Sequence, residues 1–327
     1  MSKSEKLTSV FQDADRIHFD NQSRLIFFSD IHRGDNTWAD EFAQNHAIYA
    51  YALQHYLKAG FTYIEVGDGD ELMKNRKSQH IHTAHAGIFN TLREFYAQGR
   101  FYYLHGNHDI QYRQQDYSIR NLQYTFNPYR GELEPLFPEI KIHEGLVLVH
   151  RESGGTIFVT HGHQGEYFND RFWKISRLLL RYLWRPLQLL GIQNPCRVSS
   201  NAERRKDIEL QLLSWIKENR QPLLCGHTHC AHLPRTNQLP YFNTGSCVQP
   251  RLITGIEIDR GAIMLVRWRV KPGANGGLFV QREIISGPEK LTEYFQNDGQ
   301  YGNNPQRLTA YPKIPPQPVT IEEGVFS

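Results

Sequence analysis

Five short clusters of polar residues stand directly after apolar runs in this sequence, and each contains side chains that bind metal ions. The clusters are Asp30 with His32, Asp68, Asn107 with His108 and Asp109, His161 with His163, and His227 with His229. A single cluster of this kind is typical of a turn or a solvated strand end. Five in succession favour a metal centre, because carboxylate, amide and imidazole groups are ligands that Mn²⁺, Fe and Zn²⁺ accept.

The segments that carry the first three clusters alternate between strand-like and helix-like patterns. Short apolar runs predict strands over 24–28, 61–66 and 101–104. Helical patterns at roughly 37–58 and 81–98 lie between them, and each is followed by a glycine, Gly60 or Gly99, in the position where helices end. This β-α-β-α-β order predicts parallel strands whose carboxyl ends share one edge of a sheet. The three clusters are expected at that edge.

The second half of the chain predicts strands that belong to a mixed sheet or to two stacked sheets. Runs at 146–150 and 156–160 predict a hairpin that leads into His161, and a short strand at 222–225 leads into His227. Antiparallel strands are expected over 241–246, 253–258, 262–270 and 278–284. We expect one α/β domain over residues 20–290, followed by a proline-rich tail over 291–327.

The composition excludes several classes of protein. Of the 327 residues, 39% are hydrophobic and 12% aromatic, which excludes an intrinsically disordered chain. The 37 Lys and Arg against 34 Asp and Glu leave a formal charge of +3. Such a small excess of positive charge is weak support for nucleic-acid binding, so we do not expect a nucleic-acid partner. No apolar stretch reaches the roughly 18 residues of a spanning helix, and the first residues lack the apolar core of a signal peptide. We therefore expect a cytoplasmic protein with reduced cysteines.

In order and residue type, the five clusters resemble the calcineurin-like metallophosphoesterase family, and the resemblance covers residues from about 24 to 246. It implies an αββα sandwich with two divalent metal ions at the strand ends, Mn²⁺ before Fe or Zn²⁺. One ion would be held by Asp30, His32, Asp68 and His229. The other would be held by Asp68, Asn107, His161 and His227, so that Asp68 bridges the two ions.

The resemblance also implies hydrolysis of phosphoester or pyrophosphate bonds. Two cations roughly 3.5–4 Å apart would accept phosphate oxygens and generate the attacking hydroxide near neutral pH. His108 resembles the family's general acid, and Asp109 either orients His108 or caps a turn. A nuclease or nucleotide phosphodiesterase is the alternative enzyme. A binding module that has lost catalysis is the alternative of another class, and the complete set of ligands argues against it.

Residues beside the ligands are candidates for further roles. Arg33 follows the first cluster, and its guanidinium would reach a phosphate oxygen of the substrate unless it is an ordinary surface arginine. His163 either points into the substrate cleft or is hydrogen-bonded within its own loop. Asp70 and Glu71 follow the second cluster and are expected to orient ligand histidines from behind.

Residues 166–221 interrupt the pattern between the fourth and fifth clusters. On a helix that starts at residue 171, five basic residues share one sector: Arg171, Lys174, Arg177, Arg181 and Arg185. Apolar residues take the wider arc, so residues 171–190 would contact an anionic membrane or pack as a cap on a second helix at 201–219. The position of this insert is similar to that of the lipid-accommodating lid of UDP-2,3-diacylglucosamine hydrolases, which have arginine and aspartate where this chain has His108 and His163. That similarity implies a phosphorylated small molecule, either lipid-linked or a nucleotide pyrophosphate, as substrate.

Overall fold

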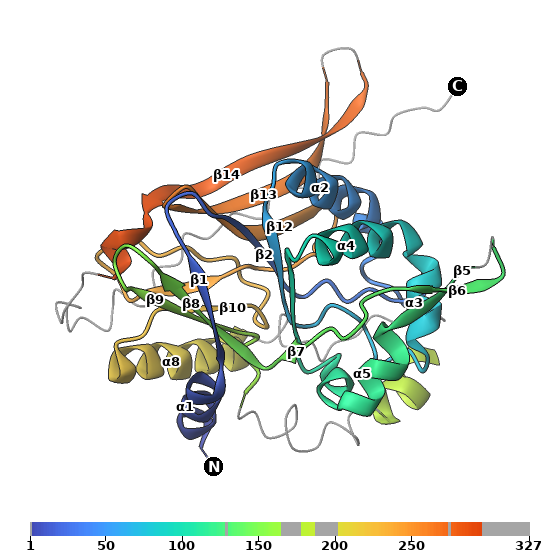
Figure 1. Cartoon of the computed structure of the whole chain (residues 1–327), viewed down its shortest axis with the longest axis horizontal. Coiled ribbons are helices and arrows are strands. Elements are labelled where there is room, and N and C mark those ends of the chain that lie inside the picture. Colours follow the sequence, from blue (N-terminus) through green and yellow to red (C-terminus); the bar gives the residue numbers. More distant parts are fainter. Residues whose placement is uncertain (1, 128–129, 165–177, 187–201, 274–275, 296–327) are drawn as a thin grey trace.

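The computed structural model describes residues 2–127, 130–164, 178–186, 202–273 and 276–295. Two β-sheets lie face to face between two layers of helices (Figure 1). This arrangement confirms the α/β fold, an αββα sandwich, that the resemblance implied.

The larger sheet has seven strands within the described residues. In spatial order they are β14 (Leu278–Lys290), β13 (Ala262–Pro272), β12 (Leu252–Asp259), β2 (Arg24–Phe28), β3 (Thr62–Val66), β4 (Phe101–Leu104) and β7 (Ile142–His143). β2, β3, β4 and β7 are parallel. β12 pairs antiparallel with β2, β13 pairs antiparallel with β12, and β14 pairs antiparallel with β13 at the edge. The parallel part is the β-α-β-α-β unit predicted for the first half of the chain.

The smaller sheet has five strands within the same described residues. Their spatial order is β1 (Asp15–Phe19), β8 (Gly145–His150), β9 (Thr156–Thr160), β10 (Leu223–Cys225) and β11 (Tyr241–Asn243). β8 and β9 form the predicted antiparallel hairpin, and the other neighbours pair in parallel. The carboxyl ends of β9 and β10 therefore point the same way.

Burial on both faces explains why the short strands are so apolar. In β2, Ile26 and Phe28 pack against α2 (His46–Lys58) and α4 (Ala86–Ala97), while Leu25 and Phe27 pack against the smaller sheet. On the far side, α1 (Lys3–Asp13) and α8 (Ala202–Asn219) cover the smaller sheet. A fully buried side chain of this size contributes about 1.5–3 kcal/mol, so alternation along one strand stabilises two layers at once.

The helices differ from the prediction in detail. The pattern at 81–98 forms two helices, α3 (Ser78–Ala84) and α4, separated at His85, whose Nε2 lies 3.0 Å from Asp40 Oδ2. The pattern at 37–58 begins as a short 3-10 helix (Ala43–Asn45) and continues as α2. Helix α1 was not predicted, although Ser2 and Glu5 form a capping box that is visible in the sequence. Between β4 and β7 the chain forms a 3-10 turn (Ile110–Arg113), α5 (Gln115–Leu122), β5 (Tyr124–Asn127) and β6 (Glu132–Pro135).

Only part of the predicted insert falls within the described residues. Residues 178–186 are described and include a π-helix (Leu180–Trp184), and α8 matches the second helix predicted at 201–219. Arg171, Lys174 and Arg177 of the predicted basic stripe lie outside the described residues, as does the tail after residue 295. None of the described helices combines the length and apolarity that crossing a membrane requires.

Candidate metal centre

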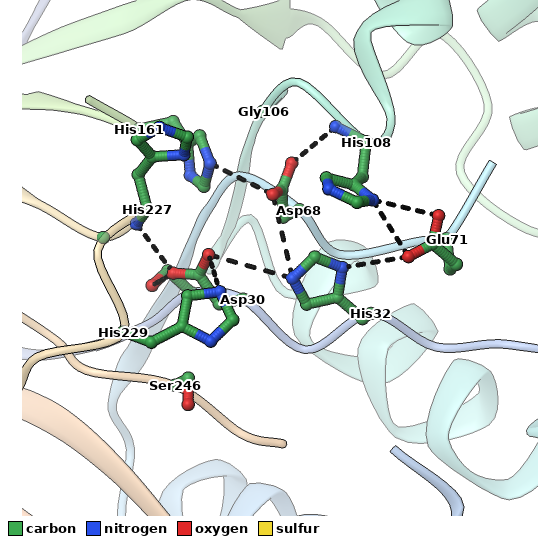
Figure 2. A network of polar contacts seen from close by, with 12 residues as sticks. Asp30, His32, Asp68, Glu71, Gly106, His108, His161, His227, His229 and Ser246 are labelled. Atoms are coloured by element: carbon green, nitrogen blue, oxygen red, sulfur yellow. Dashed lines mark hydrogen bonds and ion pairs between the residues drawn. The ribbon is translucent and has the colours of Figure 1, made fainter. Parts of the chain in front are cut away.

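The five clusters meet at the carboxyl ends of β2, β3, β4, β9 and β10, where backbone hydrogen bonds join their loops. The amide of Asp30 donates to the carbonyl of Gly67 at 3.1 Å, and the amide of His32 donates to that of Asp68 at 2.9 Å. The amide of Gly226 donates to the carbonyl of His161 at 3.1 Å. Side chains from both sheets therefore face a common site (Figure 2).

The first group of candidate ligands comprises Asp30, His32 and His229, whose ligand atoms lie within 4.8 Å of one another. His229 Nε2 is 3.1 Å from Asp30 Oδ1, and His32 Nε2 is 3.9 Å from the same oxygen. Asp30 Oδ2 accepts a hydrogen bond from the amide of His227 at 2.9 Å and another from the Ser29 hydroxyl. The Asp30 carboxylate is thus held through Oδ2, and Oδ1 faces the two imidazoles.

The second group comprises Asp68, His161 and His227, again with ligand atoms within 4.8 Å of one another. His161 Nε2 lies 3.2 Å from Asp68 Oδ2, and His32 Nε2 of the first group lies 3.8 Å from that oxygen. Asp68 therefore stands between the two groups, which is the place expected for a bridging ligand. Neighbouring positive imidazoles hold the pKa of Asp68 well below its usual value, against the opposing effect of burial.

The polar atoms of these groups fit a bound cation. Asn107 Oδ1 is buried and has no hydrogen-bond partner among the described residues. Such an atom costs about 1–3 kcal/mol when nothing binds it. His161 Nδ1 lies 2.9 Å from the Val66 carbonyl, which can only accept, so the Nδ1 proton occupies that bond and Nε2 faces Asp68. Carboxylate, amide and imidazole donors in this mixture suit Mn²⁺, Fe or Zn²⁺.

Backbone strain is concentrated at the same positions. The residues with positive φ include Asp30 (52°), His32 (52°), Asp68 (54°), His227 (66°) and His229 (58°). Residues other than glycine rarely adopt this region, and each instance costs on the order of 1–3 kcal/mol. The packing of the surrounding loops must offset that cost. Strain at five candidate ligands indicates a functional site and not a set of ordinary turns.

Two glycines allow the loops to approach one another closely. A Cβ on Gly106 would lie 2.1 Å from Asp68 Oδ1, and a Cβ on Gly226 would lie 2.5 Å from Asp30 Oδ2. Neither contact can be relieved without moving a candidate ligand, because both neighbours are the carboxylates of the site. The Gly-Asn and Gly-His pairs of the sequence therefore meet a packing requirement: each glycine makes room for a carboxylate from another cluster.

His108 lies beside the first group and is held by Glu71. His108 Nδ1 is 3.0 and 2.9 Å from the two carboxylate oxygens of Glu71, and His32 Nδ1 is 3.3 Å from one of them (Figure 2). One carboxylate thus orients both the candidate acid and a candidate ligand. Burial lowers the pKa of His108, but Glu71 and Asp68 outweigh burial and raise it to about 9. Glu71 and Asp68 therefore favour the protonated form of His108.

The carboxylate of Asp109 contacts backbone amides and not the ring of His108. Its Oδ1 accepts from the amide of Gly106 at 2.6 Å, and its Oδ2 accepts from the amide of Gly69 at 2.9 Å. Burial raises the pKa of Asp109 to about 7. Asp109 thus ties the loop after β3 to the loop after β4, and Glu71 occupies the position beside His108 that was expected for Asp109.

The prediction that Arg33 binds substrate is wrong. Arg33 is completely buried. Its guanidinium donates to Glu65 at 2.9 and 2.6 Å and to Asp70 at 2.8 Å. Arg33 therefore links the loop after β2 both to strand β3 and to the loop after β3. Glu65 was not singled out from the sequence. The signal was a charged residue inside an apolar strand, which requires a buried partner.

We expect Arg33→Leu to lower the free energy of unfolding by about 3–5 kcal/mol, because it leaves Glu65 and Asp70 as unpaired buried carboxylates. Chemical denaturation followed by circular dichroism measures this change. Arg33→Lys should lose less, since it keeps the charge. Arg260→Leu, at an exposed turn, is the control and should cost less than about 0.5 kcal/mol. A stable Arg33→Leu protein with a raised KM would restore the substrate-binding role.

His163 is buried beside the second group. Its ring centroid lies 5.4 Å from that of His161 and 6.3 Å from that of His227, and its Nδ1 has no hydrogen-bond partner among the described residues. Burial and the nearby His161 hold the pKa of His163 well below its usual value. Both effects favour the neutral imidazole. Its contact with substrate stays a prediction.

The described part of the insert is attached to the loop after β3. Arg181 Nη2 donates to the carbonyls of Leu72 and Asn75, both at 2.8 Å, and Arg185 pairs with Asp35. These two members of the predicted basic stripe face the domain, where backbone carbonyls and a carboxylate satisfy them. For residues 178–186, the expectation that the basic face meets an anionic membrane is therefore wrong.

The apolar side chains of the same segment face outward. Leu178, Leu179 and Tyr182 are 54%, 56% and 65% exposed, whereas Leu180 packs against Met73 of the same loop. The orientation of the segment is thus the reverse of that expected for a basic helix on a membrane. It presents apolar surface next to the loop that carries the residues after Glu71.

One family model matches most of the chain. The sequence model of the calcineurin-like phosphoesterase family matches residues 23–231, which include all seven candidate ligands. No curated protein matches the chain. Similar solved structures include Vps29 of Chaetomium thermophilum, at 10% identity, 81% coverage of this chain, 96% of that chain and a TM-score of 0.37. Another is a mutant of a cold-active protein tyrosine phosphatase, at 12% identity, 82% coverage of each chain and a TM-score of 0.34. Because the family match spans well over half of the sequence, the chain belongs to the calcineurin-like phosphoesterase family.

Proposed function

We propose that this protein hydrolyses phosphoester or pyrophosphate bonds with the help of two divalent cations. The observation that carries the proposal is the pair of adjacent ligand groups that meet at Asp68. Membership of the calcineurin-like phosphoesterase family supports the reaction class. Asp30, His32, Asp68 and His229 would hold one cation, and Asp68, Asn107, His161 and His227 would hold the other.

The charge of the donor set favours an anionic substrate. Bound cations would supply Lewis acidity towards phosphate oxygens and lower the pKa of water. The site contributes two carboxylates, Asp30 and Asp68, while its amide and imidazole donors are neutral when they bind a metal. Two dications would therefore keep a net positive charge that attracts a phosphoester.

His108 is the proposed proton donor to the leaving oxygen. Its backbone amide donates to Asp68 Oδ1 at 2.7 Å, which ties it to the centre, and Glu71 engages its Nδ1. Nε2 is then the ring atom left to pass a proton to substrate. The His108 side chain is 24% exposed against 6% for His32, so substrate can reach it more readily. An alkoxide leaving group needs such a proton donor.

Among phosphorylated substrates, we place a lipid-linked pyrophosphate first and a nucleotide pyrophosphate second. The exposed apolar side chains of Leu178, Leu179 and Tyr182 support this order, because Arg181 holds their segment on the loop that follows Glu71. Mn²⁺ is the proposed metal, with Fe or Zn²⁺ as alternatives.

Metal removal and restoration test the proposal. Elemental analysis of the purified protein comes first, followed by chelation and assays with Mn²⁺, Fe²⁺ or Zn²⁺ added back. The substrates are a chromogenic diester, a nucleotide pyrophosphate and a lipid-linked pyrophosphate. We expect the chelated protein to be inactive and one metal to restore hydrolysis of all three, with the highest kcat/KM on the lipid-linked substrate.

Two outcomes would contradict the proposal. Unchanged hydrolysis by a protein shown to contain no metal would remove the cations from the reaction. Metal binding without hydrolysis of any substrate would indicate a binding module on the same fold. Equal kcat/KM for the lipid-linked and nucleotide substrates would leave the reaction class intact and contradict only the substrate order.

A further inference from the structure

The hairpin formed by β5 and β6 carries apolar side chains on its outer face. Tyr124 and Phe126 alternate with polar residues along β5, and the strand register places Leu133 opposite Phe126. These three side chains are 51%, 43% and 66% exposed. A two-stranded ribbon gains its stability by covering an apolar face, so apolar exposure of this kind indicates an interaction surface.

The polar face is the one that holds the hairpin to the domain. Glu134 of β6 accepts from Arg93 of α4 at 3.2 Å and from Asn127 Nδ2 at 2.9 Å. Arg130 pairs with Glu134 at 3.2 Å. These contacts fix which side faces inward, and the apolar side faces away. The hairpin projects from the body of the molecule beside α3 and α5 (Figure 1).

Exposed cations lie at the base of the hairpin. Lys77 precedes α3 and Arg120 lies in α5, and a hydrogen bond of 2.7 Å from the Ser78 hydroxyl to Asn121 Oδ1 brings the two helices together there. Neither Lys77 nor Arg120 forms an ion pair with any of the described residues. Asp116 is the exposed acid of α5, while Glu132 and Glu134 of the hairpin are offset by Arg130 and Arg93. Lys77 and Arg120 therefore leave a net positive charge at the base of the hairpin.

We infer that the hairpin and its base dock on the surface of an anionic lipid bilayer. The docking surface, here called the hairpin face, consists of Tyr124, Phe126, Leu133, Lys77 and Arg120. Aromatic and leucine side chains enter the boundary between headgroups and acyl chains, while the cations attract anionic headgroups. The small size of the projection favours a bilayer over a protein. Each of its strands has four residues, and a stable protein interface needs about 800 Å² from each partner.

This surface differs from the one predicted for residues 171–190, and it contains no candidate ligand. Its test is therefore independent of the proposed hydrolysis. The full-length protein is sedimented with vesicles of phosphatidylcholine alone or with added phosphatidylglycerol, across a salt series. We expect binding to the anionic vesicles, weakening as salt rises because the charges are screened.

Two pairs of variants test the two parts of the surface. Lys77→Glu with Arg120→Glu should weaken vesicle binding by about 30-fold or more, since two attractive charges become repulsive. Its control is Lys58→Glu with Arg260→Glu, at the amino ends of the strands. Phe126→Ser with Leu133→Ser should weaken binding by about tenfold or more. Its control is Leu278→Ser with Phe279→Ser, 74% and 48% exposed near the far end of the β13–β14 hairpin (Figure 1).

The controls should bind vesicles as the wild type does, and all four proteins should hydrolyse a soluble diester at the wild-type rate. The inference is overturned if the wild type ignores anionic vesicles or if the control pairs lose binding equally. Self-association that depends on Phe126 and Leu133, without vesicle binding, would assign the face to a second copy. A lower melting temperature of the Phe126→Ser, Leu133→Ser variant, again without vesicle binding of the wild type, would mean that another part of the chain covers the hairpin face.

Discussion

Asp68→Asn is expected to lower hydrolysis by on the order of 10³-fold or more, or about 4 kcal/mol in transition-state free energy. The expected cause is loss of metal from both groups, because Asp68 Oδ2 faces His161 at 3.2 Å and His32 at 3.8 Å. A neutral amide in that place attracts two cations far less than a carboxylate does. Elemental analysis and the chromogenic diester assay measure the two effects on the same preparation.

Asp109→Asn is the matched control for this variant. It makes the same chemical change on the neighbouring loop, at a carboxylate that accepts hydrogen bonds from backbone amides. Burial raises the pKa of Asp109 to about 7, so the neutral form is already accessible there. Metal content and most of the activity should be kept. Near-native metal content and turnover in Asp68→Asn would show that Asp68 does not bridge two cations.

His108→Ala should lower turnover by roughly 10²–10⁴-fold on esters with poor leaving groups, with metal content unchanged. The physical reason is that the variant removes a proton donor and no candidate ligand. An activated leaving group such as nitrophenolate departs without a proton, so its hydrolysis should fall much less. Equal losses on both kinds of ester would mean that His108 acts in some other way.

Glu71→Gln is the comparison that separates orientation from proton donation. The variant keeps the imidazole of His108 but replaces the carboxylate that lies 2.9 and 3.0 Å from its Nδ1. A smaller loss with the same dependence on the leaving group is expected, about 10- to 100-fold on poor leaving groups. A loss that ignores the leaving group would instead indicate that Glu71 acts mainly through His32, its other contact at 3.3 Å.

The sequence by itself determined the β-α-β-α-β unit of the first half and the five clusters of candidate ligands, and its resemblance to a family implied the layers of the fold. Strands buried on both faces are apolar along most of their length, so runs such as Leu25 to Phe28 can be recognised without any structure. The carboxyl ends of parallel strands share one edge of a sheet, so Asp30, Asp68 and Asn107 could be predicted to lie near one another. These are local patterns joined by one topological rule.

Only the tertiary structure decided which side chains contact one another at that edge. Arg33 follows a ligand in sequence, yet Glu65 and Asp70 bury it, because a guanidinium beside two buried carboxylates is more stable paired than exposed. Glu71, three residues after Asp68, reaches His108 where the adjacent Asp109 does not.

The same limit applies to the insert. Helical spacing placed Arg181 on a polar face, but the carbonyls of Leu72 and Asn75 turned that face toward the domain. An amphipathic pattern specifies two faces and leaves open which one packs on the protein. Here that choice depends on carbonyl acceptors that lie 109 and 106 residues away in the sequence.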